Sequence, residues 1–314
     1  MQTAKVPVTP QYPDRPITMI VPFSAGSGLD VLARTLEKGA YKHLGQPLVV
    51  TNRPGGTGTL GWNEVVGAKP DGYTIGVSSV DVLLNPLYGQ TKYHYMTALE
   101  PLAQVSVASM SLAIQSEKQW NNLDDLIEYS RQHPGEVKFG HPGIGSVGHV
   151  IGESFAKAAG ITLQQVPFQG ANEATAALLG GHVQIVFASP AIFKEYVKAG
   201  TIRVLALTAE KRSSDPIFAQ TPLFKEKGLD VSLNTWFGVV APKELPAEVK
   251  EKLVIGLMAI ITDPEFKANM ERIGIEVSYL GPKETAARWQ ADNDNISKIV
   301  NETGILELIK TQKQ

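Results

Sequence analysis

Two segments of the chain share one plan, in which an apolar strand runs into a glycine- and serine-rich loop and then into an amphipathic helix. The first segment spans residues 17–30 and ends at Asp30, and the second spans residues 137–149 and ends at His149. Such a loop leaves several backbone N–H groups unpaired at the positive end of a helix dipole, which favours an anion. Two loops of this kind predict a ligand held between two lobes.

The segments that surround the first loop alternate between strands and helices. Strands are predicted at residues 17–21, 48–51 and 73–77, with helices at 29–44 and 60–68 between them. This order indicates a parallel sheet, in which ligands bind beyond the carboxyl ends of the strands.

The middle third of the chain repeats this alternation, which predicts a second sheet with loops of its own. Helices are expected at residues 123–132 and 150–159, with another that ends at Leu179. Strands are expected at 137–140, 163–166 and 183–188. The last third returns with a strand at 236–240, and its final helix, from about Lys283, is expected to cover the first lobe.

Composition narrows the classes of protein that the chain can belong to. Its 314 residues are 43% hydrophobic and carry a formal charge of −2, with no block of like charge suited to nucleic acid or anionic lipid. The chain contains no Cys, which excludes disulfides and thiolate metal sites. The longest apolar run, 253–261, is far shorter than the roughly 20 residues of a membrane span. Residues 1–10 lack the apolar core of a secretory signal, so either none existed or a processed form is present.

Seven motifs in order resemble those of a known family, and together they cover nearly the whole chain. They are residues 12–17, 21–30 with Ala33 and Arg34, 52–56, 70–73, 141–146 with His149, 179–183 and 236–238. This set resembles the solute receptors of tripartite tricarboxylate transporters, the Bug family.

The resemblance implies an α/β, two-lobed type II periplasmic-binding-protein fold. Each lobe would be a mainly parallel sheet flanked by helices, with the ligand in the cleft between the lobes. Residues 1–104 and 235–314 would form the first domain, and residues 105–234 would form the closing domain. Such a receptor binds a small carboxylate, delivers it to a two-component membrane permease, and uses no cofactor. It is periplasmic, its signal is cleaved, and we expect a monomer.

The resemblance also implies a set of ligand-binding residues. In the first lobe the backbone amides of the first loop would hold one carboxylate, with help from later loops: Phe23, Ser24, Ala25, Gly26, Ser27, Gly28, Asp30, Thr57, Gly58, Ser78 and Ser79. The second lobe would contribute Gly145, Ser146, His149, Phe168, Gln169, Gly170, Ala171 and Ser189. Polar groups in both lobes favour a dicarboxylate or a related C4 to C8 acid.

Three of these residues have two interpretations. Asp30 either compensates the helix dipole and orients its loop, or meets a donor group of the ligand. His149 pins its loop as a neutral imidazole or pairs with a second carboxylate as a cation. Phe168 either packs in the core or contacts the apolar body of the ligand.

An enzyme of doubly wound fold, such as a small-acid dehydrogenase or hydrolase, is the alternative. The glycine pattern from Gly26 lacks the third glycine of a dinucleotide fingerprint, because Val31 stands there, and no acidic residue follows the second strand. Neither Ser146 nor Ser189 has a base and an orienting residue that would make a triad. We therefore predict no catalytic residue and no metal ligand. A transcription regulator would need a DNA-binding helix-turn-helix, for which the short N-terminal extension leaves no room.

Overall fold

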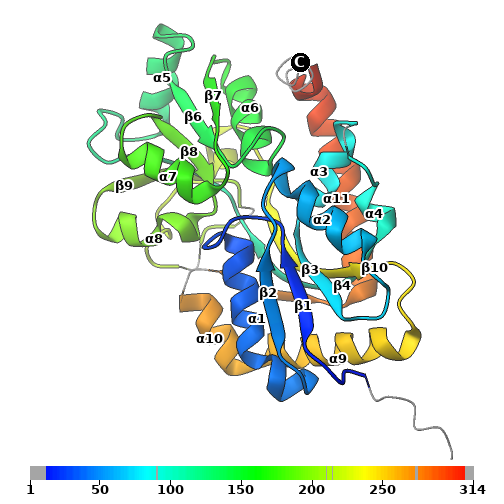
Figure 1. The fold of residues 1–314 in the computed structure, drawn as a ribbon. Helices are drawn as coiled ribbons and strands as arrows, with labels where there is room; N and C mark the ends of the chain where they lie inside the picture. The colour runs from blue at the N-terminus through cyan, green and yellow to red at the C-terminus, as the bar shows by residue number, and fades with distance from the viewer. Residues whose placement is uncertain (1–11, 90, 210, 214, 273–274, 308–314) are drawn as a thin grey trace, which may run out of the picture.

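The computed structural model describes residues 12–89, 91–209, 211–213, 215–272 and 275–307. The segment 1–10, on which the expectation about a signal peptide rests, lies outside these ranges. The described strands form two sheets, and helices flank both of them (Figure 1). The predicted α/β class is therefore confirmed.

The first sheet has six strands in the order β11-β4-β10-β3-β1-β2. Its strands are β1 (Ile17–Val21), β2 (Leu48–Asn52), β3 (Thr74–Ser79), β4 (Leu99–Ala108), β10 (Thr235–Pro242) and β11 (Val277–Leu280). Strand β1 pairs in parallel with β2 and β3, as the alternating sequence predicts, whereas β10 is antiparallel to β3 and β4. The carboxyl ends of β1, β2 and β3 therefore meet at one edge.

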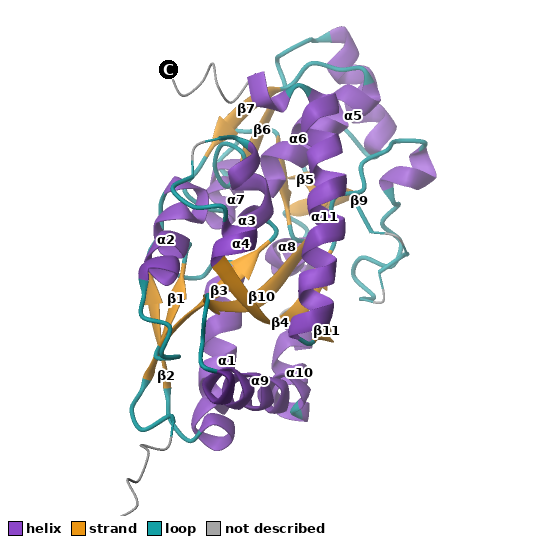
Figure 2. Cartoon of the chain, turned by 90° about the vertical axis from the view of Figure 1, so that its right-hand side faces the viewer, coloured by secondary structure: helices purple, strands orange, loops and turns teal. Residues whose placement is uncertain are grey.

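Helices cover both faces of the first sheet (Figure 2). One face buries apolar residues of α1 (Gly28–Leu44), α9 (Ala247–Thr262) and α10 (Pro264–Arg272). The other face buries residues of α2 (Thr59–Gly67), α3 (Asp81–Leu87), α4 (Tyr95–Ala98) and α11 (Pro282–Thr303). The predicted cover by the C-terminal helix is confirmed, because α11 contacts β4 and α3.

The second sheet has five strands in the order β7-β6-β8-β5-β9. Its strands are β5 (Ser111–Gln115), β6 (Lys138–His141), β7 (Gln164–Pro167), β8 (Ile185–Ala188) and β9 (Ile202–Leu207). Around it lie α5 (Leu123–Gln132), α6 (Val147–Ala159), α7 (Ala171–Leu179) and α8 (Pro190–Lys198). Two short 3-10 turns complete the described elements, η1 (Gly56–Gly58) and η2 (Phe224–Lys227). Strands β6, β7 and β8 are parallel, so their carboxyl ends also meet at one edge. Strand β5 is antiparallel to β8 and β9, and in the first sheet β11 is antiparallel to β4, so both sheets are mixed rather than mainly parallel as expected.

The chain passes from the first sheet to the second after β4 and returns before β10. Strand β4 pairs with β10 through Ala108, and β5 begins the second sheet at Ser111. On the return, Trp236 packs behind the first sheet, where it stacks on Trp289 with ring centroids 5.6 Å apart. Its Nε1 donates to Asp292 Oδ2 over 2.9 Å, which ties α11 to the returning strand.

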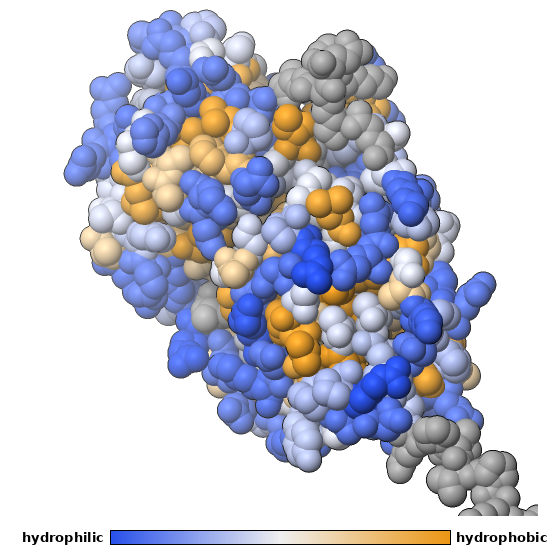
Figure 3. All heavy atoms as spheres, in the orientation of Figure 1, coloured by the Kyte–Doolittle hydropathy of each residue, from blue (hydrophilic) through white to orange (hydrophobic). Residues whose placement is uncertain are grey.

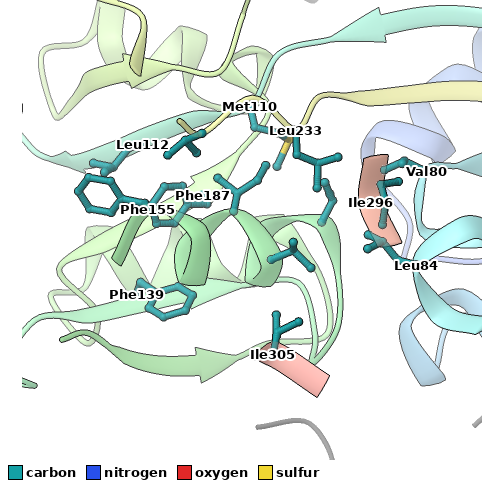
Figure 4. Packing of buried hydrophobic residues seen from close by; sticks show 14 of the residues in the cluster. Val80, Leu84, Met110, Leu112, Phe139, Phe155, Phe187, Leu233, Ile296 and Ile305 are labelled. Carbon is teal, nitrogen blue, oxygen red and sulfur yellow. The ribbon is translucent and has the colours of Figure 1, made fainter. Parts of the chain in front are cut away.

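One cluster of buried apolar residues continues from the first lobe into the second (Figure 4). Val80 and Leu84 belong to the first lobe, Phe139 and Phe187 to the second, and Ile296 of α11 packs with them. The backs of the two lobes are thus packed together, and the cleft lies on the side where the loops face each other.

The surface in the orientation of Figure 1 is mostly hydrophilic, with smaller groups of apolar residues on both lobes (Figure 3). Among the described helices, none has the length and apolar character that crossing a membrane would require.

Candidate ligand-binding cleft

The first glycine loop joins β1 to α1 at the edge where the parallel strands end. Ser27 is the N-cap of α1, and its Oγ accepts a hydrogen bond from Asp30 N over 3.3 Å. Gly26 has a φ of 79°, a left-handed conformation that favours glycine. The loop is therefore built to turn sharply into the helix, and within it Ser27 N donates to Ser24 O over 3.1 Å.

Asp30 is buried, with 2% of its surface exposed, and its carboxylate holds the loop from behind. Its Oδ2 accepts from Gly26 N and from Arg34 Nε, each over 2.9 Å. Its Oδ1 accepts from Asn52 Nδ2 over 2.9 Å, and Asn52 Nδ2 also donates to Phe23 O over 3.0 Å. Burial opposes ionisation, but the hydrogen bonds from Arg34, Gly26 and Asn52 outweigh it and lower the pKa of Asp30. This geometry favours the orienting role of Asp30.

The second glycine loop has the same construction, in which Ser146 caps α6 and accepts from His149 N over 3.3 Å. His149 is fully buried, and its Nδ1 accepts from Gly145 N over 3.0 Å. The ring stacks on His141 with centroids 4.3 Å apart. Burial and the neighbouring His149 lower the pKa of His141 to about 3, and its Nδ1 donates to Gly143 O over 2.8 Å. The two rings thus hold the loop, and His149 lines neither cavity described below.

A carboxylate from the opposite lobe occupies the start of α6. Asp81, the first residue of α3, accepts from Val147 N at Oδ1 over 2.9 Å and from Ser79 Oγ at Oδ2 over 2.7 Å. Burial raises the pKa of Asp81. Asp81 was not among the residues predicted from the sequence, although a polar residue soon after a parallel strand was a signal for it.

Two further hydrogen bonds join the lobes across the cleft. Thr57 Oγ1 donates to Ile144 O over 3.2 Å, and Asn172 Nδ2 donates to Gly26 O over 2.9 Å. Thr57 has a φ of 56°, which is unusual for a residue other than glycine, and its carbonyl accepts from Asn85 Nδ2 over 2.9 Å. The structure thus places both lobes in direct contact.

An inner cavity of about 110 Å³ lies between the loops of the two lobes. Most of its lining is apolar, and its polar side chains are Ser27, Ser79, Asp81 and Thr235 in the first lobe and Ser189 in the second. Gly28, Gly170 and Ala171 line it as well. Its apolar lining includes Phe23, Met110, Pro142, Val147, Ile192 and Phe237.

An outer cavity of about 460 Å³ opens beside it and shares Phe23 and Pro142 with it. Thr57, Gly58, Phe168 and Gln169 line this outer space. Asn85 and Tyr88, which the sequence analysis did not single out, line it too.

The predicted site residues fall into two groups by position. Those that line one of the two cavities are Phe23, Ser27, Gly28, Thr57, Gly58, Ser79, Phe168, Gln169, Gly170, Ala171 and Ser189. Those outside both linings are Ser24, Ala25, Gly26, Asp30, Ser78, Gly145, Ser146 and His149. Most of the second group belong to the two loops that support the cavities, but Ser78 is buried within β3. Within the described residues, no group of three or more His, Asp or Glu side chains is arranged to hold a metal ion.

Comparison with known proteins relates most of the chain to one family. Residues 32–305 match TctC, described as the tripartite tricarboxylate transporter family receptor. The protein BugT of Bordetella pertussis is 34% identical over 236 residues, which cover 74% of this chain and 72% of BugT. The Cupriavidus necator protein described as UPF0065 protein in gbd 5'region is 29% identical over 276 residues, or 88% of this chain and 84% of that protein.

Solved structures give the same relationship. Periplasmic binding protein BugD superposes with a TM-score of 0.87 at 30% identity, covering 94% of this chain and 99% of BugD. An R. palustris protein solved with adipate superposes with a TM-score of 0.88 at 28% identity, and the match covers 93% of this chain and 98% of that protein. A TctC solute binding protein from Polaromonas, solved without ligand, superposes with a TM-score of 0.71 at 30% identity. The match covers 93% of this chain and 99% of that protein.

Proposed function

Because the chain belongs to the receptor family of tripartite tricarboxylate transporters, we propose that it captures a small organic acid in its inner cavity and delivers it to a two-component membrane permease. The related proteins are solute-binding receptors and not enzymes. We place the receptor in the periplasm, as a monomer.

The observation that carries this proposal is the inner cavity, where helix N-termini of both lobes converge. Ser27 and Gly28 begin α1 in the first lobe, while Gly170 and Ser189 are the N-caps of α7 and α8 in the second. Gly170 and Ser189 make no side-chain capping hydrogen bond. Backbone N–H groups at the starts of α1 and α7 are therefore donors for a carboxylate, whereas α8 begins with Pro190, which has no N–H.

Neutral donors are sufficient for such a ligand. A hydrogen bond to a charged group contributes about 1.5 to 3 kcal/mol, and three or four of them outweigh the entropy cost of association at micromolar affinity. A cavity of about 110 Å³ suits a small acid. It is well below the roughly 300 Å³ at which pockets for drug-sized ligands begin.

A dicarboxylate, or a related C4 to C8 acid, is the ligand class that we favour. One carboxylate would lie on the loop before α1, and the other would lie at the starts of α7 and α8. Adipate, bound by the R. palustris relative, belongs to this class. Since Asp81 occupies the start of α6, we assign Gly145, Ser146 and His149 to holding that loop rather than to direct contact, and Asp30 to holding the first loop.

A bound ligand would stabilise the closed arrangement of the lobes further, because only that arrangement brings both helix groups to one ligand. The lobes would be residues 1–104 with 235–314, and 105–234. Since β4 extends the first sheet to Ala108, we place the first crossing at Ser109 rather than at Gln104. At similar identity, the chain superposes better on the adipate-bound relative than on the ligand-free one, which supports a change in lobe arrangement.

A thermal-shift screen with matched acids tests this proposal. Each dicarboxylate is paired with the monocarboxylate of equal length, such as succinate with butyrate and adipate with hexanoate. Ligand at 100 times its dissociation constant stabilises the folded state by about 2.7 kcal/mol, so a raised unfolding temperature identifies a binder. We expect a dicarboxylate to give a larger shift than its partner. Equal shifts would refute the two-ended ligand, and no shift with any acid would refute the receptor function.

A further inference from the structure

We infer that Asp81 is an internal latch that holds the two lobes together in the absence of ligand. Its carboxylate belongs to the first lobe and occupies the start of α6 in the opposite lobe. The proposal needs lobes that move, but it does not depend on which acid the receptor binds.

The latch consists of one side chain and one backbone group on different lobes. Asp81 follows β3 of the first sheet, whereas Val147 is the first residue of α6 beside the second sheet. Asp81 Oδ1 accepts from Val147 N over 2.9 Å, and the first N–H groups of a helix have no partner within the helix. Separation of the lobes must break this bond, whereas the bond from Ser79 Oγ to Asp81 Oδ2 stays within the first lobe.

Burial distinguishes this bond from the other hydrogen bonds across the cleft. Asp81 is 5% exposed and Val147 is 6% exposed, whereas Asn172, which donates to Gly26 O, is an exposed residue. A buried group whose partner is removed by substitution has no water to replace it while the lobes are closed, whereas opening exposes it to water. Loss of either partner therefore disfavours the closed state.

Filling of this helix start also affects the ligand. A carboxylate placed at α6 would have to displace Asp81 from Val147 N. The latch therefore reserves the start of α6 for closure and leaves the starts of α7 and α8 for the distal end of the ligand.

Val147→Pro removes the donor and leaves Asp81 in place. Proline is favoured at the first position of a helix, and Ser146 already has the extended conformation that precedes proline, with φ −68° and ψ 163°. The matched control is Val147→Ala, which shortens the same side chain and keeps the N–H. Asp81→Ala removes the acceptor, and Asp81→Asn keeps an oxygen that can accept from Val147 N.

The distance between the lobes is measured in the ligand-free protein by pulsed electron resonance. Spin labels are attached at Leu60→Cys and Ala176→Cys, both exposed, and no native Cys competes for the label. We expect a longer distance to appear in Val147→Pro and in Asp81→Ala, with a fall of roughly tenfold or more in the ratio of closed to open molecules. The controls Val147→Ala and Asp81→Asn should keep the distance of the unmodified protein.

Combining Asp81→Ala with Val147→Pro decides whether the two residues act through one bond. The double variant should open no further than either single variant, because each has already removed the same interaction. An unchanged distance in Val147→Pro, an equal opening in Val147→Ala, or additive opening in the double variant would each overturn the latch. None of these outcomes requires a ligand, so a failed acid screen would leave this result interpretable.

Discussion

Replacement of Asp30 tests whether this carboxylate orders the loop before α1. Asp30→Ala removes the acceptor of three hydrogen bonds, from Gly26 N, Arg34 Nε and Asn52 Nδ2. The bonds from Gly26 and Asn52 reach a buried carboxylate, and hydrogen bonds to a charged group are worth about 1.5 to 3 kcal/mol each. The side chain of Arg34 is 49% exposed, so water screens its ion pair, which contributes much less than the two buried bonds. We expect Asp30→Ala to lower the free energy of unfolding by about 3 kcal/mol.

Two further variants give the expected order of effects. Asp30→Asn keeps one acceptor oxygen but turns an amide towards a donor, so we expect about half of the loss. Arg34→Ala removes the exposed partner alone and should cost the least stability of the three variants. Urea unfolding measures all three as shifts of the midpoint at constant slope, and calorimetry with the acid found by the screen should show weaker binding in the same order.

The pH dependence of these variants has a defined sign. The folded protein lowers the pKa of Asp30 below its usual 3.8, so its stabilising contribution is present above about pH 4 and is lost as the pH falls through the folded value. The difference in stability between the unmodified protein and Asp30→Asn should therefore shrink in acid. An Asp30→Ala variant that loses no more stability than Arg34→Ala, or a difference that grows below pH 4, would refute the assigned role.

Two other predictions concern lobe contact and acid stability. Gly145→Ala should hinder closure, because Gly145 has a φ of 80° and an added Cβ would lie 2.5 Å from Tyr88 Cε2 in the other lobe. In solution scattering with saturating acid, this variant should have a larger radius of gyration than the unmodified protein. An equal radius would contradict the prediction. Asp263 has its pKa lowered to about 2, chiefly by the hydrogen bond from Lys42 Nζ at 2.7 Å. The stability that the Asp263 carboxylate supplies is present above about pH 4 and is lost towards pH 2. The urea midpoint of the unmodified protein should therefore fall towards that of Asp263→Asn over this range. A difference between the two midpoints that stays constant would count against the ion pair.

Local sequence signals were sufficient to predict most elements near the cleft. Strand β1 and helix α5 have the predicted bounds, and α1 ends at Leu44, one residue before the glycine that signalled its end. These segments combine apolar periodicity with caps close in sequence, so the information lies within a few residues. Helix α3 was missed because it is only seven residues long and contains Pro86, which ordinarily argues against a helix.

Contacts between distant residues were beyond a single sequence. Asp81 and Val147 are 66 positions apart, and nothing in either local pattern indicates that they meet. From the sequence the second loop was expected to bind a ligand, because the side chain that occupies its helix start comes from the other lobe. The role of His149 was open for the same reason, since only the folded loop shows that its Nδ1 accepts from Gly145 N.

The apolar cluster shared by the two lobes limits how this receptor can be rebuilt from parts of its relatives. Leu84 of the first lobe, Phe139 of the second and Ile296 of α11 belong to one packed unit, so part of the core of each lobe is shared with the other, beside clusters that each lobe buries alone. A chimera that exchanges the whole closing lobe must therefore take the matching face of α11 with it. Exchange of the loops before α7 and α8 leaves that cluster intact, which makes these loops the natural units for changing ligand preference.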